Sequence, residues 1–250
     1  MARIGVVGRR VWGMRTIVHE TAVVHESAVV HESAVVGEDT QIGPHCVVGP
    51  NAVISNCTLD RHVNIGPGCV VGHAGFGFLP KPHQGGQAQS QEQDQSLDVR
   101  EEGGEDPYMV HKPQELRVVI GEFVVLGPQC NVARGSWRDT VIGPGCKLDA
   151  LVQIGHNVVL GSAVLIAAQS GIAGSVTVGN RVAMGGQVGV AQHLSIADDV
   201  QIAGKSGVIG NITTPASVWG GYPAVPISVF RRNAIRDRHS HGHLSASPSS

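Results

Sequence analysis

Two histidines and a glycine in the second half of the chain could act together, because their spacing is close to 18 residues. His156 and Gly174 are 18 residues apart, and 18 residues further on stands Gln192, next to His193. A histidine titrates near neutrality and can act as a general base. A glycine main-chain N–H can stabilise a developing oxyanion. Together these groups suit acyl transfer, although a histidine on a regular surface also commonly serves only as a structural hydrogen-bonding group.

The spacing has meaning because the sequence repeats every six residues. Every sixth residue from Ile142 to Val208 is apolar, and the same pattern runs from Val18 to Ile54. A helix has a period of 3.6 residues and a strand a period of 2, so a period of six predicts a chain that runs straight, turns and repeats. Glycine follows many of these apolar residues, and we expect it to permit the unusual dihedral angles of the turns.

Three such sides close a triangular coil of 18 residues, and successive coils stack at about 4.8 Å, the spacing of paired strands. The predicted fold class is therefore all-β, a parallel β-helix built from hexapeptide repeats. This geometry places His156 directly beneath Gly174, with His193 on the same side. A β-helix without catalytic activity remains the alternative at this point.

Composition agrees with this architecture and excludes several others. Glycine accounts for 34 of 250 residues and charged residues for 15%, which argues against a helical bundle. The net charge of −2 does not favour nucleic-acid binding, and no apolar run is long enough to predict a transmembrane segment. Five cysteines without a C-x-x-C pair give little support to a zinc site or a disulfide framework, and the repeat explains four of them as small buried residues.

Two interruptions of the repeat are candidate functional loops, because function concentrates where a regular scaffold is broken. The first runs from Val71 to Glu115 and contains a polar tract that we expect to be disordered over about residues 80–112. The second, Arg134–Asp139, carries an Arg/Trp tip that either touches a ligand or a neighbouring chain, or is simply solvated. The predicted organisation is an N-terminal extension (1–16), a β-helix domain (17–220), and a C-terminal extension and tail (221–250) with a basic, helical segment.

Six segments in order resemble the UDP-3-O-(3-hydroxyacyl)glucosamine N-acyltransferases, the LpxD family of lipid A biosynthesis, in wording closest to plant-type members. The segments are Gly75–Phe78, Lys112–Gln114, Arg134–Thr140, Leu148–Asn157, Gly171–Ser175 and Gly221–Pro226. The resemblance implies a left-handed β-helix that forms homotrimers with active sites between subunits. It also implies transfer of an acyl chain from acyl carrier protein to the 2-amino group of UDP-3-O-acylglucosamine. No metal is required, and no cofactor beyond the phosphopantetheine of the donor.

The resemblance also assigns roles to residues. His156 matches the general base, the Gly174 amide the oxyanion donor, and His193 a second active-site histidine. The expected substrate-binding residues are Asp149, Gln153, Asn157, Phe76 and Phe78.

The chain also departs from the family pattern. The usual N-terminal uridine-binding domain is missing, and the C-terminal helical extension that engages acyl carrier protein is a short basic segment. Two alternatives therefore stay open: a zinc enzyme of the γ-carbonic anhydrase type, and a non-catalytic scaffold. An N-terminus with four arginines and no acid predicts a mitochondrial location for a plant or algal protein, whereas a bacterial one would be cytoplasmic.

Overall fold

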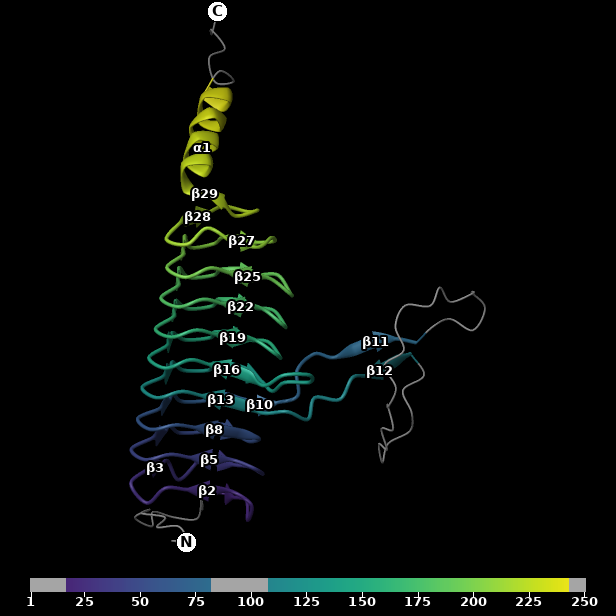
Figure 1. Ribbon diagram of the computed structural model, residues 1–250, viewed down its shortest axis with the longest axis vertical. Helices are drawn as coiled ribbons and strands as arrows, with labels where there is room; N and C mark the ends of the chain where they lie inside the picture. Colours follow the sequence, from purple (N-terminus) through teal and green to yellow (C-terminus); the bar gives the residue numbers. More distant parts are fainter. Residues whose placement is uncertain (1–16, 82–107, 243–250) are drawn as a thin grey trace, which may run out of the picture.

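The computed structural model describes residues 17–81 and 108–242, which form a triangular prism of stacked coils (Figure 1). The N-terminal coil lies at one end of the prism, and a helix continues from the other end along the same axis. The predicted N-terminal extension (1–16) and most of the predicted loop (82–107) lie outside the described residues, as does the end of the tail (243–250).

Three sheets make the sides of the prism, and almost all of their strands pair in parallel. Sheet 1 contains β1 (Ile17–Val18), β4 (Val35–Val36), β7 (Val53–Ile54), β10 (Val70–His73), β15 (Asn131–Ala133), β18 (Gln153–Ile154), β21 (Gly171–Ile172), β24 (Gly189–Val190) and β27 (Gly207–Val208). Sheet 2 contains β2 (Val23–Val24), β5 (Gln41–Ile42), β8 (Cys57–Leu59), β13 (Val118–Ile120), β16 (Thr140–Ile142), β19 (Val159–Leu160), β22 (Thr177–Val178) and β25 (Ser195–Ile196). Sheet 3 contains β3 (Val29–Val30), β6 (Val47–Val48), β9 (Asn64–Ile65), β14 (Val125–Leu126), β17 (Lys147–Leu148), β20 (Leu165–Ile166), β23 (Ala183–Met184), β26 (Gln201–Ile202), β28 (Val218–Gly220) and β29 (Val225–Pro226).

Strand pairing confirms the predicted 18-residue coil. In sheet 1, Ile154 of β18 pairs with Ile172 of β21, which pairs in turn with Val190 of β24. These inward-facing residues are buried, as are all five cysteines. The core is thus a continuous stack of aliphatic side chains, each coil covering the next, which is why a six-residue period alone identifies its members.

Glycine serves a different purpose from the one expected. Among the described residues, 18 non-glycine residues adopt positive φ, among them Asn51 and Asn157, against four glycines. Glycine follows the inward residues because neighbouring coils approach closely there. A Cβ placed on Gly43, for example, would lie 2.9 Å from the carbonyl oxygen of Leu59. The expectation that these glycines permit unusual dihedral angles is wrong: they remove a steric conflict between coils.

The two interruptions and the C-terminal segment keep the prism intact. The first interruption leaves after β10 and returns at β13, and its base forms an antiparallel hairpin of β11 (Phe78–Pro80) and β12 (Met109–His111) that projects sideways (Figure 1). The basic C-terminal segment forms α1 (Ile227–Gly242). His239 and His241 lie within this helix. Within the described part of the chain, no helix is long and apolar enough to cross a membrane.

Candidate active site

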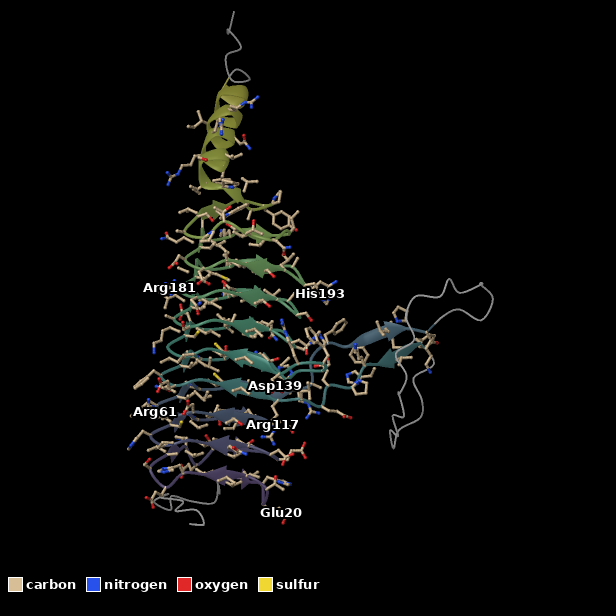
Figure 2. The ribbon with its side chains drawn as sticks, in the orientation of Figure 1. Glu20, Arg61, Arg117, Asp139, Arg181 and His193 are labelled. Atoms are coloured by element: carbon tan, nitrogen blue, oxygen red, sulfur yellow. The ribbon has the colours of Figure 1, made fainter. Side chains whose placement is uncertain are left out.

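His156 lies at the corner where the chain passes from sheet 1 to sheet 2, between β18 and β19. We call the connections at this edge the His156 corner; it comprises the described residues 74–81, 108–117, 134–139, 155–158, 173–176 and 191–194. Both interruptions of the repeat therefore emerge at the same edge of the prism as His156. Figure 2 shows His193 on the side from which the hairpin projects, with Arg61 and Arg181 on the opposite side.

The imidazole of His156 packs directly against Gly174 of the next coil. A Cβ placed on Gly174 would lie 2.6 Å from His156 Cε1 and 2.7 Å from Nε2, so only glycine leaves room for the ring here. Main-chain hydrogen bonds continue the stack, because Ser175 N donates to His156 O at 2.8 Å and His193 N to Gly174 O at 3.1 Å. The predicted placement of 156 beneath 174 is confirmed.

Among the described residues, the Gly174 N–H has no hydrogen-bond acceptor. His156 Nε2 likewise has no hydrogen-bond partner among them. Two groups with hydrogen-bonding capacity to spare thus lie side by side on a half-buried surface. Burial lowers the pKa of His156, and the nearby charges of His193 and Lys112 lower it further. The imidazole is therefore held neutral at physiological pH, the state that a general base requires.

The second interruption is folded back onto this site rather than solvated. Arg138 Nε donates to Asn157 O at 2.7 Å, and its Nη2 reaches Ser175 O at 3.3 Å. Trp137 is exposed over 58% of its surface and stacks on the guanidinium of Arg138, 4.7 Å from the ring centre. Sequence reasoning missed this role of Arg138, because spacing does not tell whether a loop arginine turns outward or caps carbonyl groups of its own chain.

The expected substrate-binding residues fall into three places. Asn157 is 1% exposed and lies behind the imidazole, with Nδ2 2.8 Å from His156 Nδ1, so its amide is occupied by internal contacts. Gln153 is exposed on sheet 1 and lines a groove floored by glycines and closed by Tyr222. Asp149 lies at the corner between sheets 3 and 1, away from His156 in the same chain.

The hairpin carries the two phenylalanines expected at the site. Phe76 is 85% exposed and meets Phe78 edge-on, with ring centroids 5.4 Å apart. Buried Gln114 ties the base of the hairpin to the prism, accepting a hydrogen bond from Gly75 N. Both aromatic side chains are therefore exposed at the His156 corner.

The described residues contain no cluster of three or more His, Cys, Asp or Glu arranged to hold a metal ion. The buried cysteines behave as core residues; burial raises the pKa of the Cys57 thiol to about 12.

Comparison with known proteins finds hexapeptide repeats in the chain and relatives named as acyltransferases. Residues 21–56, 39–73 and 139–174 match the family model described as bacterial transferase hexapeptide (six repeats). The chain is 41% identical over 183 residues to a probable UDP-3-O-acylglucosamine N-acyltransferase 2, mitochondrial, of Arabidopsis thaliana, covering 73% of this chain and 52% of the relative. It is 48% identical over 187 residues to a UDP-3-O-acylglucosamine N-acyltransferase of Hydrogenovibrio crunogenus, covering 74% and 46%. The chain spans about half the length of these relatives.

Solved structures confirm the fold class. A UDP-N-acetylglucosamine O-acyltransferase from Moraxella catarrhalis superposes with a TM-score of 0.58 at 25% identity, covering 84% of this chain and 73% of the other. A UDP-N-acetylglucosamine acyltransferase from Campylobacter jejuni gives a TM-score of 0.62 at 21% identity, covering 92% and 86%. The predicted left-handed parallel β-helix is thereby confirmed.

Proposed function

Because the chain is a hexapeptide-repeat homologue of proteins named UDP-3-O-acylglucosamine N-acyltransferase, we propose that it is an N-acyltransferase of lipid A biosynthesis. It moves an acyl chain from a thioester on acyl carrier protein to the 2-amino group of a UDP-linked 3-O-acylglucosamine.

In the proposed reaction, the amine nitrogen attacks the thioester carbonyl carbon, forming the new C–N bond. His156 takes the proton that the amine loses, and the Gly174 N–H donates to the carbonyl oxygen as it gains negative charge. The C–S bond then breaks, and the proton held by His156 passes to the departing thiolate. The products are the amide and the free thiol, so no metal or redox cofactor is needed.

The observation that carries this proposal is the contact between His156 and Gly174. One imidazole with a lowered pKa meets one main-chain N–H that has no acceptor among the described residues, at the edge where both loops leave the prism. The uncatalysed aminolysis of a thioester has neither a positioned hydrogen-bond donor for the oxyanion nor a positioned proton acceptor. This contact supplies both within reach of one carbonyl group.

We also propose that the functional unit is a homotrimer. Asp149 lies at a different corner of the same chain from His156, and Phe76 at the hairpin is 85% exposed. Packing three prisms side by side brings such surfaces of one chain to the His156 corner of the next. Arg231 and Arg232 of α1 are exposed and positively charged, and we propose that they contact the acidic acyl carrier protein.

For location, the arginine-rich N-terminus and the name of the Arabidopsis relative support a mitochondrial protein. Fusing residues 1–20 to a fluorescent protein tests this, since a diffuse signal in plant cells argues against import.

The function is tested by supplying acyl-acyl carrier protein and two acceptors, UDP-3-O-acylglucosamine and the same compound with its amine acetylated. We expect amide formation only with the free amine. No product with either acceptor would overturn the proposal. Zinc bound at one equivalent per chain, together with CO₂ hydration, would instead favour the zinc enzyme, and absence of both activities would favour a scaffold.

A further inference from the structure

The side-chain amide of Asn157 has only one orientation that satisfies its neighbours. One end of the amide accepts hydrogen bonds from the main-chain N–H groups of Ser136, at 2.7 Å, and Trp137, at 3.3 Å. A main-chain N–H only donates, so the atom facing these two groups is the oxygen Oδ1. The NH₂ group, Nδ2, therefore lies on the other side, 2.8 Å from His156 Nδ1.

This orientation determines where neutral His156 carries its proton. An amide NH₂ only donates, so His156 Nδ1 must accept. A neutral imidazole has one donor and one acceptor nitrogen, and the proton is consequently on Nε2. In that tautomer the nitrogen beside Gly174 presents an N–H and not a lone pair, and it cannot receive a proton from an attacking amine.

The amide cannot turn over unless the loop moves as well. Asn157 is 1% exposed, and a turned amide would set its NH₂ against the two main-chain donors of the loop. Arg138 holds the loop in place through Asn157 O, at 2.7 Å, and Thr177 Oγ1, at 3.2 Å. Breaking these contacts leaves buried donors and acceptors without hydrogen-bond partners, which is unfavourable.

We infer that Asn157 is a positioning residue that sets the tautomer of His156, and that the loop Arg134–Asp139 controls it. When the loop withdraws from Asn157, the amide can turn, and its oxygen then accepts a proton-bearing Nδ1. One proton leaves Nε2 for water and another binds Nδ1, so the charge is unchanged and Nε2 gains its lone pair. The indole of Trp137 is exposed on this loop, so a bound substrate can contact it and displace the loop. The catalytic consequence rests on the proposed acyl transfer, whereas the tautomer itself does not.

The resting tautomer can be measured in the unmodified protein by ¹⁵N NMR of labelled histidines, with His156→Gln used to assign the signal. Long-range couplings distinguish a protonated Nδ1 from a protonated Nε2. Lys112 and His193, the charged groups that face the ring, influence its pKa and do not select between its nitrogens. We expect a protonated Nε2 in the substrate-free protein at pH 8. A protonated Nδ1 would overturn the inference.

Asn157→Asp provides the sharpest variant. One carboxylate oxygen can accept the loop N–H groups while the other accepts from Nδ1, and the φ of 59° suits aspartate as well as asparagine. We expect the proton to move to Nδ1 and the pKa of His156 to rise beside the new negative charge. Asn51→Asp, at an exposed position with a φ of 57°, is the matched control and should leave the His156 signal unchanged. An Nε2 proton that persists in Asn157→Asp contradicts the assignment.

Arg138→Gln tests the loop by removing its anchor without touching the amide. We expect a mixture of the two His156 tautomers, and an unchanged signal would remove the loop from the account. Because these spectra need no substrate, the two proposals can fail separately. If acyl transfer is absent while the tautomers respond as expected, only the proposed function is lost; if the tautomers do not respond, the inference is lost whatever the activity.

Discussion

At the scale of single residues, His156 is defined by what surrounds each edge of its ring. Asn157 occupies one nitrogen from behind, and Gly174 leaves the space that the other nitrogen needs. The sequence predicted this meeting of His156 and Gly174, because an 18-residue period is a statement about position. It did not predict that Asn157 is buried, since hydrogen bonding from the neighbouring loop depends on how that loop folds.

Charge near the ring predicts a pH dependence. The pKa of His156 is lowered by burial, by His193 and by Lys112, so the acid limb of kcat/KM should lie below the ordinary histidine value of 6.5. Lys112→Gln removes one positive charge, which raises the pKa of His156 and moves the limb to higher pH. Lys205→Gln, on an exposed turn of another coil, should leave the pH profile unchanged. A limb that moves to lower pH in Lys112→Gln contradicts this electrostatic account.

A methyl group at Gly174 should displace the imidazole. The added Cβ of Gly174→Ala would lie 2.7 Å from His156 Nε2, too close for the ring to keep its place. A displacement of about 1 Å can cost about 10²-fold in rate, so we expect a loss of that order in kcat with the fold retained. Gly210→Ala, whose Cβ meets nothing within 4 Å, is the control. Equal rates for the two variants would show that the contact is not needed.

At the scale of the elements, short strands and tight corners repeat so regularly that each coil explains the next. The buried column of Ile154 and Ile172 followed from the period alone. The corner conformations did not, because positive φ falls largely on polar residues such as Asn51 and Gln169, whose individual types carry little information. The stacking of the flat sheets determines the backbone conformation at each corner, whatever the conformational preference of the residue there.

Gly72, at the irregularity within β10 where the pairing register shifts, is a glycine whose replacement should destabilise the protein. Its φ is +83°, and an added Cβ would overlap the carbonyl oxygen of Ser55 in the coil below. The left-handed conformation costs about 1–2 kcal/mol for a residue with a side chain, and overlap adds about 1–3 kcal/mol. We expect Gly72→Ala to lower the free energy of unfolding by about 2–5 kcal/mol in urea titrations. Gly171→Ala, with open space around its Cβ, should change it little, and similar stabilities would refute the overlap.

At the scale of the whole molecule, the prism brings loops that are distant in sequence to one edge. The interruption after β10 and the loop 134–139 after β15 both leave sheet 1 at the corner that holds His156. The sequence predicted where the repeat breaks but not that the breaks share an edge with the histidine, since that depends on the count of strands between them. This convergence brings both interruptions of the repeat to one edge of the prism.

Exposed apolar side chains at the same edge predict that the protein is a trimer. Large apolar groups as exposed as Phe76 and Leu79 commonly mark an interface, and a β-helix trimer would cover them. Sedimentation equilibrium should give about three times the chain mass of 26.1 kDa. Phe76→Ser should weaken the trimer by removing one such group. A monomer at micromolar concentration would contradict the proposed assembly.

The acyl-transfer rate of His156→Ala tests most directly whether His156 is the general base. Loss of a general base typically costs about 10²–10⁴-fold, so we predict a fall of this size in kcat, with the far-UV circular dichroism unchanged. His25→Ala, an exposed histidine near the N-terminal end of the same prism, should retain the wild-type rate. An active wild type with an equally active His156→Ala variant would show that this imidazole does not carry the proton.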